Sequence, residues 1–297
     1  MTYGKKCDYD KVAESWELSC HKDGPSVVAD GEYKGLTLNE YIEKAGKGVL
    51  GKNCERFENF PILIKLIDAK DNLSVQVHPD NDYAMRVEGE YGKTEMWYVV
   101  DCDEGATLLY GFKHEITKEE FARRIADNTL LEVTNAVPVK KGDVFFIKSG
   151  TLHAIGKGIL IAEIQQNSNT TYRIYDYGRV GKDGKPRELH VDKALDVTKL
   201  APAEQYPETP VEKKDGYDIK LLSKCEYFTT YRVNVETKAE LDADENSFNS
   251  ILVLEGEPVI SGGETVSAKK GESVFISAGT GKYTVEGKCT FVLTKID

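Results

Sequence analysis

A segment of fourteen residues occurs twice in this chain, and this repetition constrains the fold more than any other feature. Residues 140–153 (KKGDVFFIKSGTLH) align without a gap on residues 269–282 (KKGESVFISAGTGK), with seven of the fourteen positions identical. Each copy has the pattern of a turn, a buried strand and a second turn with glycine. A unit that recurs 129 positions later predicts two domains of one architecture. His153 aligns with Lys282, so chemistry that needs an imidazole is expected in the first domain.

Composition narrows the class of protein. A length of 297 residues is typical of about two domains, each with its own core. No apolar leader and no run of membrane-spanning length occurs, so no membrane partner is expected. The six scattered cysteines, without a CxxC pair, favour reduced thiols in a cytoplasmic protein. A net charge of −11 argues against nucleic acid as a partner, and no obligate protein partner is evident.

Short strand patterns separated by glycine turns predict a mainly β fold, either a sandwich or a barrel. Capping-box sequences at Thr37–Glu40 and Thr117–Glu120 open two helical patterns, and the second predicts a helical insertion over about residues 117–131. Prolines 202, 207 and 210 indicate a linker. We therefore expect a first domain over residues 1–200, a linker over 201–215 and a second domain over 216–297. Strands are predicted at 61–66, 73–78, 95–100, 144–147, 159–165, 171–176, 227–235, 250–254, 274–276 and 290–293.

Polar residues near two of these strands could meet at one site. Strand alternation puts Ser74, Gln76 and His78 on the face opposite the interleaved leucine and valines. Lys93 and Glu95 likewise share one face of a later strand. A mixed set of nitrogen and oxygen donors suits Zn²⁺ with an open coordination position. The candidate metal ligands are Gln76, His78, Glu95 and His153.

Taken singly, these residues have ordinary explanations. A histidine before a proline, such as His78, is more often a surface or hydrogen-bonded residue than a ligand. Glu95, beside Trp97, would by itself be a solvated strand residue. His153 differs, because the aligned repeat shows which position was specialised. The remaining histidines are expected to be structural or surface residues: His21, His114 and His190.

The spacing from Gly142 through Gly150 to His153 resembles the second motif of the cupin superfamily, with Lys148 where that motif usually has proline. The chain as a whole resembles the short bacterial form of type I mannose-6-phosphate isomerases, or phosphomannose isomerases. The resemblance covers the first domain nearly end to end and the second domain more loosely. The resembling segments are residues 14–21 (ESWELSCH), 60–69 (FPILIKLIDA), 73–80 (LSVQVHPD), 92–98 (GKTEMWY), 149–156 (SGTLHAIG) and 165–176 (QQNSNTTYRIYD).

This resemblance implies two cupin-type jelly-roll β-barrels, with one Zn²⁺ per chain in the first and a degenerate, metal-free second. It implies a zinc enzyme that interconverts mannose 6-phosphate and fructose 6-phosphate, with a hexose 6-phosphate as its partner. The family's catalytic arginine maps onto Arg173, and the lysine before the zinc glutamate maps onto Lys93. The family's zinc ligands map onto Gln76, His78, Glu95 and His153.

An aldose–ketose isomerase moves a proton between C1 and C2 through an enediol(ate). A metal held by neutral ligands and one carboxylate keeps positive charge and polarises the sugar oxygens, and Arg173 could stabilise the charge that develops. The residue that transfers the proton is not identifiable from sequence. The candidates for binding the substrate's phosphate are, in falling order, Ser74, Lys65, Arg179 and Lys182.

Two other classes of protein stay open on sequence alone. A cupin dioxygenase or another metallo-cupin enzyme would use a similar ligand set, usually with a second histidine in place of Gln76. A sugar-binding cupin without catalysis would keep the barrel and lose the ligands, as the second domain is expected to have done. The identity of the metal and activity on hexose 6-phosphates would separate these classes.

Overall fold

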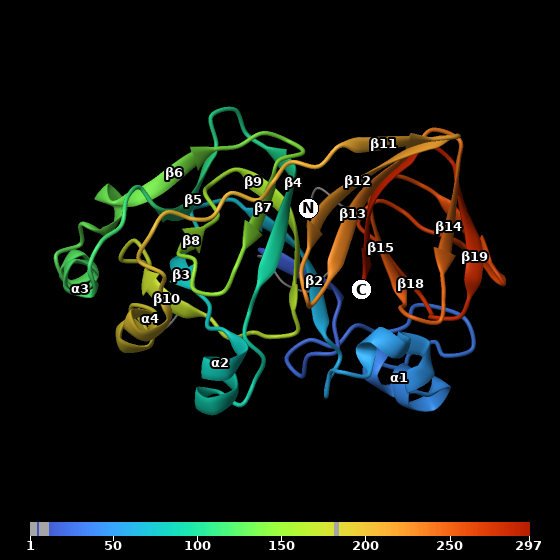
Figure 1. Ribbon diagram of the computed structural model, residues 1–297, viewed down its shortest axis with the longest axis horizontal. Helices are drawn as coiled ribbons and strands as arrows, with labels where there is room; N and C mark the ends of the chain where they lie inside the picture. The colour runs from blue at the N-terminus through green and yellow to red at the C-terminus, as the bar shows by residue number, and fades with distance from the viewer. Residues whose placement is uncertain (1–4, 6–11, 181–183) are drawn as a thin grey trace. The chain divides into compact units, whose positions relative to one another are not determined.

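The chain forms two compact units, which are described separately (Figure 1). The computed structural model describes residue 5, residues 12–180 and residues 184–297. Residues 67–206 make one unit, called here the central unit, and residues 1–66 with 207–297 make the other, called the terminal unit. The chain passes from the central unit to the terminal unit between residues 206 and 207, which lies within the predicted linker. The sequence places residues 1–66 in the first domain, whereas here they group with the C-terminal strands.

The central unit is built on two groups of antiparallel strands. In one, β4 lies between β7 and β9, and in the other the strand order is β10-β3-β8-β5-β6. Strand β2 (Ile62–Ala69) runs across the boundary between the units. The remaining bounds are β3 Val75–Val77, β4 Glu95–Cys102, β5 Thr107–Phe112, β6 Thr134–Pro138, β7 Val144–Ile147, β8 His153–Ala154, β9 Ile159–Gln166 and β10 Tyr172–Tyr175.

The predicted helical insertion is shorter than expected. Helix α3 (Lys118–Ala126) begins after Thr117, whose side chain accepts a hydrogen bond from the N–H of Glu120. It ends because Asn128 adopts a left-handed φ of 60°, and a separate 3₁₀ turn, η3, follows at Leu130–Glu132. Two helices were not predicted, α2 (Asn81–Val87) and α4 (Val191–Val197). No helix in the described part of the chain is long and apolar enough to span a membrane.

The terminal unit combines the N-terminal segment with two β-sheets of orders β11-β12-β13-β20-β15-β18 and β14-β19-β16-β17. Helix α1 (Leu38–Ala45) opens with the predicted capping box of Thr37 and Glu40. The N-terminal bounds are β1 Glu14–Leu18, η1 Lys47–Leu50 and η2 Lys52–Cys54. The C-terminal bounds are β11 Val211–Lys214, β12 Tyr217–Lys224, β13 Thr229–Val235, β14 Lys238–Ala243, β15 Asn249–Gly256, β16 Val259–Gly262, β17 Glu264–Ser267, β18 Ser273–Ile276, β19 Gly281–Glu286 and β20 Cys289–Lys295.

Backbone hydrogen bonds attach the N-terminal segment to these sheets. The N–H of Phe248 donates to Leu50 O at 3.1 Å, and the N–H of Ala278 donates to Val49 O at 2.9 Å. A Cβ on Gly51 would lie 2.4 Å from the carbonyl oxygen of Asn246, so this approach requires glycine. Residues 49–51 are therefore part of the terminal unit's structure. The sequence carries no pattern that indicates this pairing.

The repeated segment forms the same structure in both units. Val99 accepts a hydrogen bond from the N–H of Gly142 at 2.8 Å, and Val253 accepts one from Gly271 at 2.7 Å. Both strands carry a bulge directly after these valines. The strand predicted within each copy is confirmed as β7 and β18. The mainly β fold is also confirmed, whereas closed barrels are not observed, because each sheet of the described residues has two open edges.

After the shared strand, the residue whose side chain points inward comes one position later in the second copy than in the first. His153 on β8 is fully buried, whereas Lys282 on β19 is exposed and Tyr283 belongs to the core instead. Gly281, with φ 73°, places a second left-handed residue in this turn. Because a step of one residue turns a strand's side chains to the opposite face, Tyr283 takes the inward position. Lys282, which aligns with His153 in the sequence, therefore does not take its inward position in the structure.

Candidate metal centre

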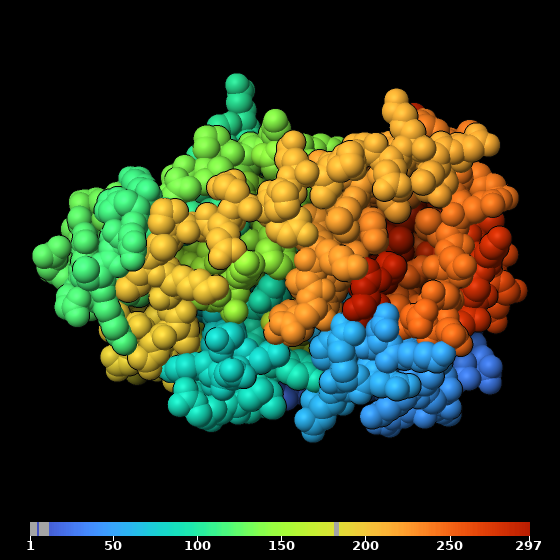
Figure 2. Space-filling model, in the orientation of Figure 1, coloured from blue at the N-terminus to red at the C-terminus, as the bar shows by residue number. Residues whose placement is uncertain are grey.

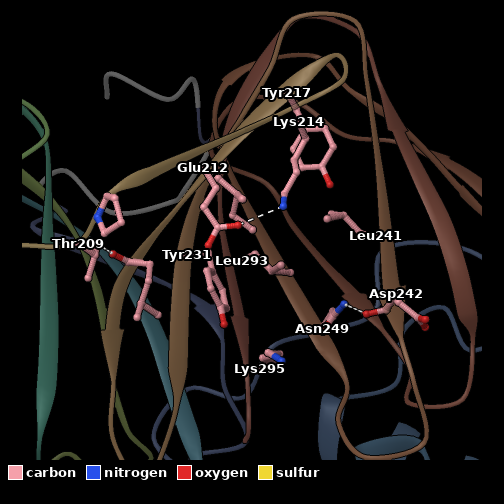
Figure 3. Close-up of a pocket in the computed structure, with 13 residues that line it drawn as sticks. Thr209, Glu212, Lys214, Tyr217, Tyr231, Leu241, Asp242, Asn249, Leu293 and Lys295 are labelled. Atoms are coloured by element: carbon pink, nitrogen blue, oxygen red, sulfur yellow. Dashed lines mark hydrogen bonds and ion pairs between the residues drawn. The ribbon is translucent and has the colours of Figure 1, made fainter.

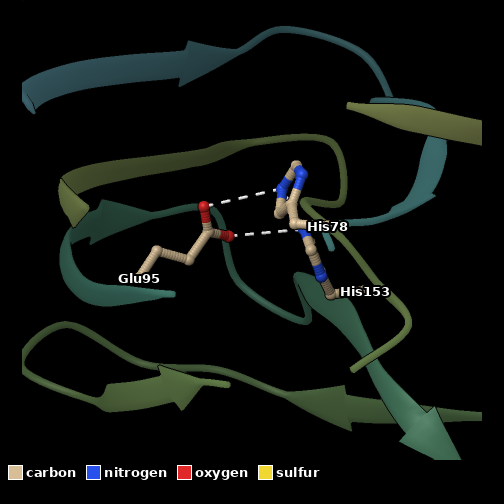
Figure 4. A group of neighbouring side chains, drawn as sticks. All are labelled: His78, Glu95 and His153. Carbon is tan, nitrogen blue, oxygen red and sulfur yellow. Dashed lines mark hydrogen bonds and ion pairs between the residues drawn. The ribbon is translucent and has the colours of Figure 1, made fainter. Parts of the chain in front are cut away.

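Three of the predicted metal ligands converge inside the central unit. His78 directly follows β3, Glu95 begins β4 and His153 begins β8, and one ligand atom from each lies within 4.8 Å of the others. His153 Nε2 is 3.3 Å from Glu95 Oε1, and His78 Nε2 is 3.6 Å from Glu95 Oε2. The two Nε2 atoms are 3.1 Å apart. All three side chains are buried, and the carboxylate faces both rings (Figure 4).

Backbone carbonyls fix which nitrogen of each ring carries the proton. His78 Nδ1 lies 2.9 Å from Thr170 O, and His153 Nδ1 lies 2.8 Å from Thr151 O. A carbonyl only accepts, so each neutral ring is protonated on Nδ1 and presents the lone pair of Nε2 to the site. Burial lowers the pKa of His153 to about 4. This histidine is therefore neutral near pH 7, which is the form that binds metal ions.

These donors fit a zinc ion. Two nitrogen lone pairs and a carboxylate face one another at 3.1–3.6 Å, so all three can direct electron pairs at one cation. The Gln76 amide nitrogen lies 3.3 Å from His153 Nε2, and exchange of the amide nitrogen and oxygen, which have nearly the same shape, would turn its oxygen toward the site. A set of two imidazoles, one carboxylate and one amide oxygen contains the ligand types that Zn²⁺ prefers.

A buried lysine brings positive charge to the same place. Lys93 Nζ lies 2.9 Å from Glu95 Oε2, 3.2 Å from His78 Nε2 and 3.6 Å from Glu163 Oε1. Glu163, on β9, is a second buried carboxylate, and its Oε2 accepts a hydrogen bond from Trp97 Nε1 at 2.8 Å. Our sequence reasoning missed Glu163. The available signal is a lone acidic residue in the otherwise apolar run ILIAEI, because an unpaired carboxylate is rarely buried.

Backbone contacts before β4 hold Lys93 in place. The N–H of Lys93 donates to Pro79 O at 3.0 Å, and the N–H of Gly92 donates to Asn81 Oδ1 at 2.9 Å. A Cβ on Gly92 would lie 2.3 Å from the carbonyl carbon of Asp80, so no other residue permits this approach. The sequence GKTE thus positions a lysine and a carboxylate at one site through a glycine that cannot be replaced without moving the chain.

Arg173 lies in the sheet that carries two of these residues. On β10 it pairs with Gln76 of β3, and Gln76 pairs with His153 of β8. Residues directly opposite each other in a sheet share a face, so the three side chains form a row. Arg173 Nη1 donates to Glu188 O at 3.0 Å, and its buried Nε has no hydrogen-bond partner among the described residues. Burial and the neighbouring charge of Arg187 lower the pKa of Arg173.

Two more arginines lie close to Arg173 and share one carboxylate. Asp176 accepts from Arg179 Nε at 3.1 Å and from Arg187 Nε at 2.6 Å. Although burial acts in the opposite direction, the hydrogen bonds from Arg187 and Arg179 lower the pKa of Asp176. Three guanidinium groups thus lie near the carboxylates of Asp176 and Glu188, which leaves an excess of positive charge here. Arg187 was not among the residues predicted from the sequence.

The other predicted phosphate-binding residues have different settings. Ser74 is buried directly before β3. Lys65 lies on β2 in the terminal unit, where its Nζ is 3.9 Å from Glu14 Oε2 and 4.9 Å from the centre of the Trp16 ring. Lys182 lies outside the described residues. The structure therefore brings together the predicted metal ligands, Lys93 and the row containing Arg173, and it adds Glu163 and Arg187.

The fold and the site define a mainly β protein with a buried centre of metal-binding type. The family described as "Phosphomannose isomerase type I, catalytic domain" matches residues 6–105, and "Mannose-6-phosphate isomerase, cupin domain" matches residues 218–296. The mannose-6-phosphate isomerase ManA of Bacillus subtilis is 38% identical over 296 residues, covering 99% of this chain and 92% of the relative. That of Streptococcus mutans is 38% identical over 281 residues, covering 92% and 85%. The chain belongs to the type I phosphomannose isomerases and is an enzyme of that family.

Solved structures agree with this assignment. The crystal structure of the mannose 6-phosphate isomerase from Bacillus subtilis has a TM-score of 0.92 and 37% identity, covering 98% of this chain and 92% of that one. A structure of a protein from Archaeoglobus fulgidus has a TM-score of 0.76 and 27% identity, covering 96% of this chain and 87% of that one. The whole chain, including the N-terminal segment of the terminal unit, thus follows the family's architecture.

Proposed function

We propose that this enzyme is a zinc-dependent aldose–ketose isomerase that interconverts mannose 6-phosphate and fructose 6-phosphate. The observation that carries the proposal is the convergence of His78, Glu95 and His153 within 4.8 Å, with the buried Lys93 beside them. The relatives from Bacillus subtilis and Streptococcus mutans are named mannose-6-phosphate isomerases, and this chain aligns with most of each. The proposal includes one zinc ion per chain, held by the central unit.

The reaction defines what the site must do. In the open-chain aldose a base takes the C2 proton, the electron pair of the C2–H bond forms the C1=C2 bond of an enediolate, and the C1 oxygen takes the negative charge. Return of a proton to C1, with transfer of the O2 proton to O1, leaves the ketone at C2. Groups that contact the charged oxygen more strongly than the neutral carbonyl accelerate this step. Zinc, when bound, supplies Lewis-acid polarisation of the sugar oxygens.

The chain's own residues supply the remaining functions. His78, Glu95 and His153 would hold the metal. Gln76 would be the fourth ligand if its amide oxygen and nitrogen exchange places, because the oxygen then faces the site. Lys93 is a catalytic residue in this proposal, because its ammonium lies at the centre and can donate hydrogen bonds to a sugar oxygen. Its Nζ lies between two buried carboxylates, 2.9 Å from Glu95 Oε2 and 3.6 Å from Glu163 Oε1.

Arg173 is the second catalytic residue of the proposal. It shares a sheet face with Gln76 and His153, and its buried Nε has no hydrogen-bond partner among the residues that the structure describes. A guanidinium with an unused donor can bond an oxygen whose charge increases during the reaction. The enediolate is the species that provides such an oxygen. Arg173 would therefore act on the transition state more than on the bound substrate.

The cluster of Arg179, Arg187 and Asp176 is the best candidate for the 6-phosphate. Its two guanidinium groups and one carboxylate leave a local charge of +1 in a protein whose net charge is −11, so it gives a dianion a favourable position that the overall field does not. Ser74 and Lys65 stay as predicted substrate-binding residues, since Ser74 is buried before β3 and Lys65 extends from β2. We also infer that each unit is an open form of the cupin-type jelly roll.

A coupled assay for fructose 6-phosphate formation tests this proposal. Purified protein should convert mannose 6-phosphate, lose activity with a chelator and regain it with Zn²⁺. Zinc-loaded, folded protein without conversion in either direction would contradict the isomerase assignment. Oxygen consumption with a cupin-dioxygenase substrate, in place of isomerisation, would favour the alternative metallo-cupin class.

A further inference from the structure

The terminal unit contains a cavity of about 480 Å³ that the proposed reaction does not use. Leu293 and Lys295 of β20 line it, together with Tyr217 and Tyr231 from neighbouring strands and Leu241 from the facing sheet. In Figure 2, dark red atoms of the last strand lie at the floor of a hollow with an orange rim. Figure 3 shows the tyrosine rings and Asn249 gathered around this space.

The cavity occupies the same place in its unit as the metal centre occupies in the central unit. Asn249 begins β15 and pairs with Ile276, as Glu95 begins β4 and pairs with Ile147. Ile147 and Ile276 are equivalent residues of the repeated segment. Asn249, which lines the cavity, is thus the counterpart of the metal-site carboxylate. The terminal unit thus has an interior opening at the place where the central unit has its metal-site carboxylate.

Polar groups with unused hydrogen-bonding capacity face this opening. Asn249 is 2% exposed, and its Nδ2 donates to Tyr283 Oη and to Asp242 O, each at 2.9 Å. Within residues 12–180 and 184–297, no hydrogen bond involves Asn249 Oδ1 or the hydroxyl of Tyr231. One amide oxygen and one hydroxyl, which can donate or accept, are therefore available to a ligand.

The two lysines of the lining are each paired with a carboxylate, and Asp242 adds a further carboxylate to the lining. Lys214 Nζ lies 3.1 Å from Glu212 Oε2, and Lys295 Nζ lies 2.8 Å from Asp297 Oδ1. An anion would have to compete with these carboxylates for the two ammonium groups, so the lining does not favour a phosphate. The remaining walls are aromatic and aliphatic. A neutral ligand with both hydroxyl groups and C–H faces matches this surface.

We propose that the cavity is a binding site for a small neutral polyol, an unphosphorylated monosaccharide. Its C–H face would lie against the rings of Tyr217 and Tyr231, and its hydroxyl groups would bond to Asn249 Oδ1 and Tyr231 Oη. The volume lies within the range of about 300–1,000 Å³ that is usual for small-molecule sites. This inference does not depend on the reaction at the metal centre.

Isothermal titration calorimetry of the full-length, zinc-loaded protein with D-mannose, D-glucose and D-sorbitol tests it. At least one of these probes should bind saturably, with an affinity that is unchanged in His153→Ala and at least about tenfold weaker in Tyr231→Leu, a loss of about 1.4 kcal/mol. Tyr231→Phe keeps the ring and should lose only the part due to the hydroxyl. Both tyrosine variants should retain wild-type isomerase activity, which shows that they fold.

Three results would overturn the proposal. The first is absence of saturable binding for all three probes. The second is binding that disappears in His153→Ala but persists in both tyrosine variants, because that pattern places the sugar at the metal centre. The third is tighter binding of mannose 6-phosphate than of mannose to His153→Ala, abolished by Tyr231→Leu, because the cavity would then select an anion.

Discussion

The same scaffold position carries opposite chemistry in the two units. In the central unit Glu95 lies 3.3 Å from His153, so a carboxylate faces an imidazole lone pair. In the terminal unit the equivalent Asn249 donates a hydrogen bond to Tyr283 Oη at 2.9 Å. The first pair needs a cation to be stable when buried, whereas the second pair satisfies itself. At these two positions a metal-binding pair in the central unit thus corresponds to a neutral pair in the terminal unit.

A neighbouring pair shows the same contrast. Trp97 of β4 pairs with Glu163 of β9, and its indole N–H donates to that carboxylate. At the equivalent place in the terminal unit, Ile251 of β15 pairs with Leu293 of β20. A buried ion costs several kcal/mol unless it is paired, and Lys93 meets that need only in the central unit. Charge is thus buried at this place in the central unit, whereas the equivalent place in the terminal unit is apolar.

The largest expected effect is on the metal. His153→Ala removes one imidazole, so zinc content should fall well below one per chain and kcat should fall by about 10³-fold. Tyr283→Phe is the matched change in the terminal unit, and it should leave zinc content and kcat unchanged. Elemental analysis and the coupled assay measure both. One zinc ion per chain in His153→Ala, or two zinc ions per wild-type chain, would contradict the assignment of a single metal centre to the central unit.

A smaller effect is expected at Arg173. Arg173→Ala should lower kcat by about 10²-fold and raise KM less, because the guanidinium acts on charge that develops in the transition state. Zinc should stay bound, since arginine is not a ligand. Steady-state kinetics with zinc analysis checks this. A near-normal kcat with a raised KM would reassign Arg173 to phosphate recognition, and zinc loss would make it a structural support of the site.

The pH dependence of stability should also distinguish the units. Burial lowers the pKa of His153 from 6.5 to about 4, so the unfolded chain binds this proton at a higher pH than the folded chain. Its contribution is fully present above pH 6.5 and is lost as pH falls toward 4, a change of about 3 kcal/mol for the metal-free protein. Burial raises the pKa of Tyr283 instead, so Tyr283 stays neutral over this range.

Urea unfolding of chelator-treated protein at several pH values measures this contribution of His153 to the free energy of unfolding. The free energy of unfolding should fall more steeply between pH 6.5 and 4 in wild type than in His153→Gln. Tyr283→Phe should keep the wild-type slope. Equal slopes in wild type and His153→Gln would mean that the ring is protonated in the folded state near its ordinary pKa.

Much of the central site could be predicted from sequence because its residues lie on strands with clear alternation. His78, Glu95 and His153 were identified from parity and from the repeat, and the structure places them together. Glu163 was missed because its strand reads as continuously apolar, so alternation gives no signal for the face of a single acidic residue. Arg187 was missed because only tertiary contact brings it to Asp176.

The terminal unit was predicted less well for a physical reason. Identity at seven of fourteen positions suggested a gapless equivalence of His153 and Lys282, but side-chain direction depends on backbone dihedrals that sequence identity does not report. The pairing of residues 49–51 with the C-terminal strands has no local pattern either, since only backbone atoms make it. The sequence alone therefore did not predict the long-range backbone contacts or the positions of single left-handed residues.

The smallest expected effect tests the residue that reverses the side-chain direction in the second copy. Gly281 has φ 73°, and a Cβ there would meet nothing within 4 Å, so the cost of Gly281→Ala comes from the dihedral alone. A left-handed alanine costs about 1–2 kcal/mol, and the free energy of unfolding should fall by that amount. Gly48→Ala is the control, because its added Cβ also meets nothing within 4 Å and its φ is not positive. If both variants were equally stable, Gly281 would not need its left-handed conformation. The inward position of Tyr283 would then require another cause.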